Sequence, residues 1–304
     1  MPRLKIGTRG SPLALAQARE TRARLMAAHG FSETDIEIIV ITTTGDRIPD
    51  RPLAEIGGKG LFTKEIEEAL AAGEIHLAVH SMKDMPAQLP RGLTIAALLP
   101  REDPRDAFIS PIANSVDELP IGAVVGSSSV RRTAQLLRLR PDVKSVQFRG
   151  NVETRLRKLA EGVAQATFLA CAGLNRLGLA GKITAPMPIE VMLPAVAQGA
   201  IGLETRADDK ATRDLLAAIN HRETEIAVAC ERAFLSALDG SCRTPLAGHA
   251  TLSGTTLQFR GHALTLDGKH CFETTRQGPL ADAARMGRDA GEDVKARGGA
   301  LIAF

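Results

Sequence analysis

Short apolar runs alternate with amphipathic segments over the first 210 residues of the chain. Apolar runs of this length between turn residues are typical of buried strands. We expect strands at 4–7, 36–41, 75–79, 123–125, 143–148 and 166–171. Helical patterns follow most of these runs. The alternation therefore predicts mostly parallel α/β sheets with right-handed crossovers.

Capping residues predict where two of the helices begin and end. Ser11 followed by Pro12 is typical of an N-cap and first helical residue, and Gly30 predicts the end of that helix. Apolar residues at helical spacing over 62–70 predict a second helix, which we expect to end at Gly73.

Two interruptions of the alternating pattern predict crossings between domains. Residues 100–105 combine prolines with charges, and a second crossing is expected near 193–202. After about residue 220, one long amphipathic helix precedes alternating strands, a helix over 282–297 and a final apolar strand. Turn pairs at 253–254 and 267–268 favour an antiparallel sheet there. We expect an α/β domain 1 at 1–99 plus about 200–219, an α/β domain 2 at 100–199 and a small α+β C-terminal domain at 220–304.

The composition excludes several classes of protein. With 304 residues, 44% of them hydrophobic and 24% charged, the chain matches soluble globular proteins rather than disordered or fibrous ones. No apolar run reaches the ~18 residues that cross a bilayer, and the N-terminal sequence has no signal-peptide pattern, so we expect a cytoplasmic protein. The net charge of +3 and the absence of Trp and Tyr disfavour nucleic-acid binding.

The cations are mostly arginine, with 28 Arg against 10 Lys. The arginine side chain is a planar fork that binds carboxylate or phosphate groups with two parallel hydrogen bonds. A GC-rich genome would produce the same bias. The arginines therefore indicate an acidic ligand only if they cluster.

Polar residues do cluster directly after the predicted strands. They occupy 8–11, 80–84, 126–132 and 149–151, with Arg155 one helical turn later. In open α/β sheets the ligand crevice lies outside the carboxyl ends of the strands, and helix N-termini there attract anions. Each cluster taken singly is more simply an ordinary N-cap with a surface arginine. Four clusters in equivalent places favour a small ligand with several negative groups.

Asp84 is the one acid within residues 80–84, and Lys83 lies beside it. Its carboxylate is either a salt-bridge partner for a neighbouring cation or a group that stabilises a cation formed during a reaction. Its position in the sequence leaves both interpretations open.

Two further patterns argue against common ligands. The glycines of 57–60 lack the spacing of a phosphate-binding loop, and they predict either a flexible flap carrying Lys59 and Phe62 or a plain loop. His76 and His80 would lie about 13 Å apart on a strand, too far to share one metal ion. We therefore expect no metal.

Cys242 differs from the other cysteines. Cys171, Cys230 and Cys271 lie in apolar strands or on an apolar helix face, and each is most simply a small buried hydrophobe. Cys242 lies in a loop next to Arg243, whose charge favours the thiolate. It is either a structural cysteine or a nucleophile or attachment point.

Eight ordered segments together point to one family. They are 8–15, 57–62, 79–84, 101–108, 127–132, 149–152, 193–200 and the loop around Cys242. Through them the chain resembles the hydroxymethylbilane synthase family, also called porphobilinogen deaminase, over essentially its whole length. Two positions depart from the family pattern, because Ser241 precedes the cysteine where glycine is common and Arg243 follows it where an uncharged residue is common.

The resemblance implies a fold and an enzymatic activity. It implies two lobes similar to type II periplasmic binding proteins, with two crossovers, and a third domain that carries the cysteine. Family members condense four porphobilinogen molecules head to tail, lose ammonia at each step and release linear hydroxymethylbilane by hydrolysis. Growth starts from a dipyrromethane cofactor, which is joined to a cysteine by a thioether. Cys242 matches that cysteine.

The resemblance also implies roles for individual residues. Asp84 matches the catalytic carboxylate that stabilises the azafulvenium cation left when ammonia departs. The residues matched to cofactor binding are Lys83, Asp84, Ser127, Ser128, Ser129, Arg131 and Arg132. The residues matched to substrate binding are Arg9, Ser11, Lys59, Phe62, Arg149, Arg155 and Arg176. The implied partner is porphobilinogen, with no nucleic acid, membrane or metal, and the implied state is a monomer.

Two other functions compete with this interpretation. A non-catalytic, two-lobed anion-binding protein would explain the arginines and the crossovers but not Cys242 or the third domain. A nucleic-acid binder using Arg131, Arg132 and Arg149 is disfavoured by the modest net charge. Reversible ligand exchange without a covalent adduct would distinguish the first, and salt-dependent binding to DNA or RNA would distinguish the second.

Overall fold

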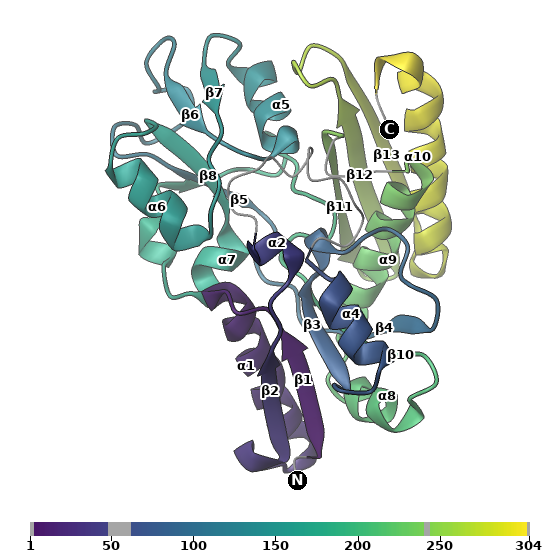
Figure 1. Ribbon diagram of the computed structural model, residues 1–304. Helices are drawn as coiled ribbons and strands as arrows, with labels where there is room; N and C mark the ends of the chain where they lie inside the picture. The colour runs from purple at the N-terminus through teal and green to yellow at the C-terminus, as the bar shows by residue number, and fades with distance from the viewer. Residues whose placement is uncertain (1–2, 48–61, 240–243, 303–304) are drawn as a thin grey trace. The chain divides into compact units, whose positions relative to one another are not determined.

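The computed structural model describes residues 3–47, 62–239 and 244–302 (Figure 1). The described chain divides into two compact units. Unit 1 consists of residues 3–47, 62–102 and 200–225, and unit 2 consists of residues 103–199, 226–239 and 244–302. The chain thus changes unit near both predicted crossings. The division into three domains stays a prediction, since the C-terminal sheet belongs to the same compact unit as the second α/β sheet.

Unit 1 is built on a mixed five-stranded sheet with the order β2-β1-β3-β10-β4. Its strands are β1 (Leu4–Thr8), β2 (Ile36–Val40), β3 (Leu77–Ser81), β4 (Leu93–Leu98) and β10 (Ile201–Arg206). Its helices are α1 (Pro12–His29), α2 (Thr44–Arg47), α4 (Lys64–Ala71) and α8 (Lys210–Ala217), with 3-10 turns η1 (Glu33–Asp35) and η2 (Met82–Asp84). β1 pairs in parallel with β2 and β3, whereas β10 runs antiparallel to β3 and β4.

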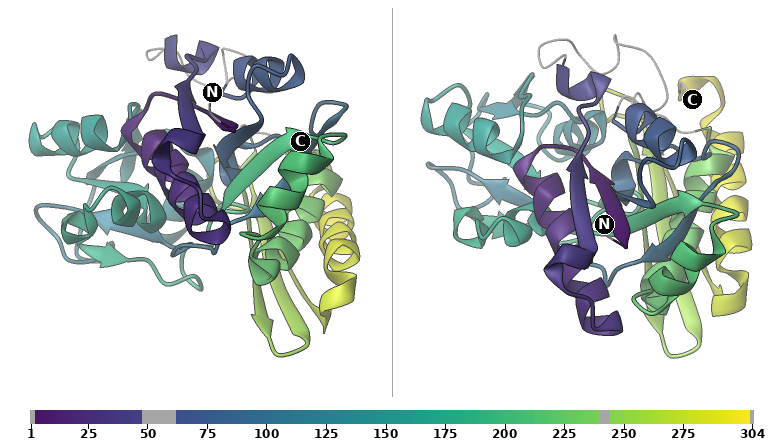
Figure 2. Two further views of the ribbon diagram at one scale, coloured as in Figure 1. Left: turned by 90° about the horizontal axis from the view of Figure 1, so that it is seen from below. Right: turned by 60° about the horizontal axis from the view of Figure 1, so that its bottom comes forward.

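Helices cover both faces of this sheet. On one face, Leu25 of α1 and Leu216 of α8 pack with Ile6 of β1 in one buried cluster. On the other face, Ile66 and Leu70 of α4 belong to a separate buried cluster. Figure 2 shows α1 lying along β1 and β2. Both faces are apolar because each is buried, as parallel sheets require.

The predicted limits of α1 are confirmed, and those of the next helix only in part. The Ser11 hydroxyl caps α1 by accepting the Ala14 N–H at 3.3 Å, and Gly30 ends the helix with φ of 67°. The α4 helix begins at Lys64, so the expectation that Phe62 belongs to it is wrong. Phe62 lies in the preceding turn.

Unit 2 contains a second five-stranded sheet with the order β7-β6-β8-β5-β9. Its strands are β5 (Asp106–Ile109), β6 (Val124–Gly126), β7 (Lys144–Val146), β8 (Ala166–Ala170) and β9 (Ala185–Pro186). Its helices are α5 (Val130–Leu139), α6 (Val152–Ala160) and α7 (Cys171–Arg176), with the 3-10 turn η3 (Ala180–Lys182). Leu136 of α5 packs on one face with Phe108, and Leu159 of α6 packs on the other with Phe148.

The two α/β sheets share one plan. In each, three parallel strands are followed by one antiparallel strand, β10 or β5, and then by an edge strand. The antiparallel strand is in each case the one that the chain forms soon after entering the unit from the other. Two crossovers and two matching sheets are the arrangement expected for two lobes, and the α/β fold class is confirmed.

The C-terminal part of unit 2 is an antiparallel three-stranded sheet, β11-β12-β13. The strands are β11 (Leu246–Ser253), β12 (Thr256–Leu264) and β13 (Cys271–Pro279), and the helices are α9 (Arg222–Ala237) and α10 (Ala283–Gly298), with η4 (Leu280–Asp282) and η5 (Gly299–Leu301). Figure 1 shows α10 running along this sheet. Gly287 lets α10 approach α9, because a Cβ there would lie 2.0 Å from the Cys230 carbonyl oxygen.

One predicted element is wrong. Gly299 takes φ of 47°, and the described C-terminal residues continue as the 3-10 turn η5 instead of the expected strand, while residues 303–304 lie outside the described residues. Ile302 instead packs against Gly298 at the end of α10. Among the described helices, none has the length and apolar character needed to cross a membrane.

Candidate functional site

Unit 1 brings together the polar residues that follow β1 and β3. These strands are adjacent and parallel, so the segments after them leave the sheet at the same edge. A hollow at this edge is lined by Arg9 and Ser11 after β1 and by Ser81 and Asp84 at and after the end of β3. Phe62 completes one side of it. Two of the four polar clusters that follow predicted strands therefore lie close together within this unit.

Arg9 is already paired in this hollow. Its Nε lies 3.1 Å from Oδ1 of Asp46, and its Nη2 donates to the same oxygen. The guanidinium also lies over the Phe62 ring, 4.2 Å from the centroid. Partial burial opposes ionisation of Asp46, but hydrogen bonds from Arg9 and Thr43 prevail and hold the pKa of its carboxyl below its usual value. A ligand carboxylate at Arg9 must therefore compete with Asp46.

The serine hydroxyls of this edge serve local structure. Ser11 caps α1, and Ser81 Oγ accepts a hydrogen bond from Gln17 Nε2 at 2.8 Å. Both residues still line the hollow, together with Gln17. A hydroxyl that accepts one hydrogen bond keeps a proton to donate. The Ser11 hydroxyl can therefore donate to a ligand while it caps α1, whereas Ser81 Oγ already donates to Gln17 Oε1 at 3.2 Å.

Asp84 differs from the other charged groups of this edge. It ends the 3-10 turn η2, is exposed, and lines the hollow. Among the residues that the structure describes, its carboxylate has no hydrogen-bond or ion-pair partner. The salt-bridge interpretation of Asp84 thus receives no support from the described part of the chain. Lys83 is the neighbouring residue in η2 and is also exposed.

A buried acid–histidine cluster lies beneath the same edge and was not predicted. His80 Nε2 lies 3.0 Å from Oε2 of Glu204, and both side chains are buried. Burial raises the pKa of Glu67, and the nearby charge of Glu204 adds to the effect. His76 instead accepts the Lys5 N–H through Nδ1 at 3.0 Å. The two histidines therefore have separate partners.

In unit 2, the three serines after β6 shape the turn into α5. Ser129 Oγ accepts the Arg132 N–H at 3.5 Å as the N-cap, and Ser127 Oγ accepts the Ser129 N–H at 3.2 Å. Ser128 Oγ accepts the Phe148 N–H at 2.9 Å. In this structure the three serine hydroxyls therefore form the hydrogen bonds of ordinary capping, which was the alternative to anion binding.

Arg131 and Arg132 form a buried cluster with Asp106. Arg132 Nη2 lies 2.7 Å from Oδ1 of Asp106, and Arg131 Nη1 lies 2.7 Å from Oδ2. The arginines are 5% and 6% exposed and the aspartate 0%. Burial opposes ionisation of Asp106, but the two guanidinium groups outweigh it and hold the pKa of its carboxyl well below its usual range. The cluster keeps a net charge of one positive unit.

The donors of Arg132 are largely used inside the protein. Its Nε and Nη2 donate to Asp106, and its Nη1 donates to the Phe168 carbonyl at 2.9 Å. Gln198 adds a further hydrogen bond to Asp106 at 3.0 Å. Asp106 lies within one of the segments that carry the resemblance, but the sequence does not indicate that it pairs with both arginines.

Arg149, Arg155 and Arg176 have different surroundings. Arg155 Nε donates to the Gly150 carbonyl at 2.8 Å, and Arg176 Nη2 donates to the Gly199 carbonyl at 3.1 Å. Arg149 is half-buried, and its buried Nη1 has no hydrogen-bond partner among the described residues. A buried guanidinium nitrogen without a partner is costly, so it indicates a missing acceptor.

Two predicted site residues, Lys59 and Cys242, lie outside the described residues. The other three cysteines are free thiols. Burial raises the pKa of Cys171 and that of Cys271 to about 11, and the pKa of Cys230 to about 12. Cys271 is only partly buried, so its prediction as a small buried hydrophobe is wrong.

Arginines and an aspartate without a partner among the described residues lie at the carboxyl ends of the parallel strands, where α/β proteins hold their ligands. Sequence models of two family domains match the chain. The domain described as "Porphobilinogen deaminase, dipyromethane cofactor binding domain" matches residues 4–214, and "Porphobilinogen deaminase, C-terminal domain" matches residues 225–296. The chain belongs to the porphobilinogen deaminase family.

Individual relatives agree with this assignment. A protein named porphobilinogen deaminase from Paracoccus denitrificans is 60% identical over 294 residues, which cover 97% of this chain and 94% of that protein. A protein of the same name from Nitrobacter winogradskyi is 56% identical, with 97% and 93% covered. Among solved structures, a periplasmic substrate-binding protein of an ABC transporter from Coxiella burnetii is 14% identical, with a TM-score of 0.43 over 71% of this chain and 91% of that one.

The described hydrogen-bond donors and acceptors fit a dipyrromethane cofactor, the group named in the description of the matching family domain. An oligopyrrole with acid side chains presents carboxylates, which need cationic donors, and ring N–H groups, which need an acceptor. The unpartnered Arg149 Nη1 supplies a donor in unit 2. The exposed carboxylate of Asp84 supplies an acceptor in unit 1. Each unit thus offers a group of the kind that such a ligand requires.

Proposed function

We infer that this chain catalyses the reaction of its family and is a hydroxymethylbilane synthase, a transferase of tetrapyrrole biosynthesis. The observation that carries the inference is the match of both family domains across nearly the whole chain, with relatives at 56% and 60% identity. Its substrate is porphobilinogen. Four molecules are joined head to tail with loss of ammonia, and water then releases the linear product.

The cofactor is dipyrromethane, attached through a thioether to Cys242. Lys83, Asp84 and Arg131 bind it together with Arg132 and the three serines that precede α5. When bound, the cofactor supplies the nucleophilic ring carbon to which the first substrate unit is joined. The positive charge left over in the Asp106 cluster supports this role, because it attracts acid side chains even though most Arg132 donors are engaged.

The substrate carries one acetate and one propionate, so its recognition needs several cationic donors. Arg9, Arg149, Arg155 and Arg176 bind these acids, and Ser11 adds a hydroxyl, while Lys59 and Phe62 border the substrate. Arg149 has the strongest structural support, because its buried Nη1 lacks an acceptor among the described residues. At Arg9, the substrate carboxylate displaces Asp46.

Asp84 is the catalytic residue. Loss of ammonia leaves a positive charge on the substrate, and a fixed carboxylate beside it lowers the energy of the transition state. The same carboxylate accepts ring N–H groups and so orients the reacting ring. Asp84 forms no ion pair with any described residue, so its negative charge is available to stabilise the cation. Neither a metal nor a nucleic acid has a part in the proposal, and the protein acts as a monomer in the cytoplasm.

Intact-protein mass spectrometry tests the proposal. The purified chain should carry the added mass of two linked pyrrole units, and Cys242→Ser should lose both this mass and activity. Cys230→Ser is the matched control, because Cys230 is buried and its thiol pKa is raised to about 12. It should keep the adduct. A protein without the adduct that still forms hydroxymethylbilane would contradict the attachment, and an adduct-bearing protein without activity would contradict the proposed reaction.

A further inference from the structure

His262 is a buried histidine without a hydrogen-bond partner. His262 is 5% exposed, and neither nitrogen of its ring has a hydrogen-bond partner among the described residues. Leaving both ring nitrogens unsatisfied is unfavourable, and such a group calls for an explanation.

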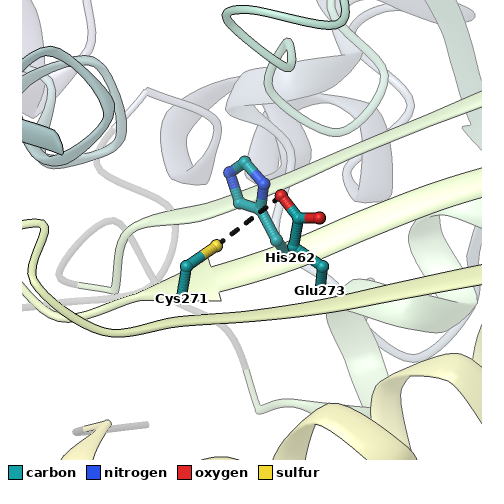
Figure 3. A group of neighbouring side chains, drawn as sticks. All are labelled: His262, Cys271 and Glu273. Atoms are coloured by element: carbon teal, nitrogen blue, oxygen red, sulfur yellow. Dashed lines mark hydrogen bonds between the residues drawn. The ribbon is translucent and has the colours of Figure 1, made fainter. Parts of the chain in front are cut away.

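The strand register places a thiol and a carboxylate beside this imidazole. In the β12–β13 hairpin, His262 pairs with Glu273 and Leu264 pairs with Cys271. Directly opposed residues, and residues two apart on one strand, share a face of the sheet. His262, Cys271 and Glu273 therefore project to the same side, as Figure 3 shows. One candidate ligand atom from each lies within 4.8 Å of the other two.

We propose that His262, Cys271 and Glu273 form a zinc site on one face of this hairpin. Imidazole, thiolate and carboxylate are all ligands that Zn²⁺ accepts in a tetrahedral site. In such a site a sulfur and an oxygen ligand are separated by about 3.6 Å, as follows from ordinary bond lengths. Cys271 Sγ and Glu273 Oε1 are 3.9 Å apart. Small side-chain rotations bring the three atoms to one ion, and water takes the fourth position.

The charges around the site favour a zinc ion that is bound by two negatively charged ligands. Arg260 contacts Glu273 with Nη2 at 3.4 Å from Oε1, and the charges of Arg138 and Arg131 also act on His262. These cations oppose a bare divalent ion. The ion is therefore held only when Cys271 binds as thiolate and Glu273 as carboxylate, so that two negative charges match Zn²⁺. The thiol proton is released to solvent as the zinc–sulfur bond forms, and no redox change occurs.

The site is accessible from solvent. The Glu273 side chain is 53% exposed and Cys271 is partly exposed, so an ion can enter from that side. None of the three residues belongs to the segments that carry the family resemblance. Bound zinc would link the two strands next to the turn at residues 267–268.

Cobalt substitution tests this site on the complete, cofactor-bearing protein after chelator treatment. Added Co²⁺ should give a thiolate-to-cobalt charge-transfer band and intense visible bands typical of tetrahedral coordination, and Zn²⁺ should displace them. Cys271→Ser should remove the charge-transfer band and weaken Zn²⁺ binding by more than about 100-fold, since even changes to outer-shell partners cost 10–100-fold. His262→Leu should weaken binding similarly, and it also removes the unsatisfied nitrogens.

His270→Gln is the matched control, because His270 is an exposed histidine next to Cys271 that is not part of the cluster. It should keep the spectrum and the affinity of the parent protein. Catalytic activity should be unchanged in all three variants. Absence of a Zn²⁺-displaceable thiolate band in the parent protein would overturn the proposal, and so would a band that persists in Cys271→Ser.

Discussion

The polar clusters of the two α/β units lie at the same edge of matching sheets, but their carboxylates differ in burial and in partners. In unit 2, Asp106 is fully buried and holds both Arg131 and Arg132. In unit 1, Asp84 is exposed and has no partner among the described residues. The edge of a parallel sheet therefore gathers charged groups in both units. The carboxylate whose partners the protein supplies stabilises the fold, whereas the carboxylate without a described partner is the one that we assign to the chemistry.

The Asp106 cluster should carry the largest effect on stability. Asp106→Asn leaves two buried guanidinium groups without their counter-ion, and breaking a buried ion pair from one side costs about 3–5 kcal/mol of unfolding free energy. Urea denaturation at pH 7 measures this. Glu68→Gln is the control, because the exposed pair of Glu68 with Lys64 contributes less than about 1 kcal/mol. Equal effects of the two variants would remove the contrast between buried and exposed charges.

Arg149 should show the opposite pattern to Asp106. Arg149→Gln should lower kcat/KM for porphobilinogen by about 10–100-fold, because a hydrogen bond to a charged group contributes about 1.5–3 kcal/mol. Its free energy of unfolding should stay the same or rise, since a buried nitrogen without a described acceptor is removed. Steady-state kinetics and urea denaturation measure the two quantities, with the exposed Arg288→Gln as control. Loss of stability with normal kinetics would make Arg149 a structural residue.

Replacing Asp46 should have a smaller effect on substrate binding, and its effect on stability should depend on pH. Asp46→Asn releases Arg9, so KM for porphobilinogen should fall severalfold, while stability at pH 7 should drop by less than about 1 kcal/mol. Hydrogen bonds keep the pKa of Asp46 below its ordinary value of 3.8 despite partial burial. The stability that its ionised form contributes is therefore present above pH 3.8 and lost as the pH falls through the lower folded-state pKa. Urea denaturation at pH 7 and near pH 3 should show the difference between parent and variant shrinking, and an unchanged KM would remove Arg9 from substrate binding.

Local signals in the sequence predict most of the fold. Ser11, Pro12 and Gly30 define α1 because capping depends on neighbouring residues alone. The strands β5 and β10 were not predicted, because each carries a charged residue such as Asp106 or Glu204 and takes its place in the sheet through partners that are distant in the sequence. The C-terminal strand was predicted wrongly because the apolar pattern outweighed the two glycines before it.

The sequence predicts where the site residues lie but not which residues pair with them. Strand ends predict that Arg9 and Asp84 lie at one edge of the sheet in unit 1 and that Arg132 lies at the matching edge in unit 2. The partners of the arginines lie 37 residues from Arg9 and 26 residues from Arg132, and nothing local indicates them. The His262 cluster, in contrast, could have been found from the sequence. The turn at 267–268 fixes a register that pairs His262 with Glu273.

The central claim is that the carboxylate of Asp84 acts in the chemistry rather than in the fold. The most direct measurement is the turnover rate of Asp84→Asn, normalised to molecules that carry the cofactor by intact mass, beside the exposed control Asp208→Asn. The account predicts a loss on the order of 10²-fold or more for Asp84→Asn, with an unchanged urea midpoint and normal turnover in the control. Near-normal turnover of cofactor-bearing Asp84→Asn would contradict it.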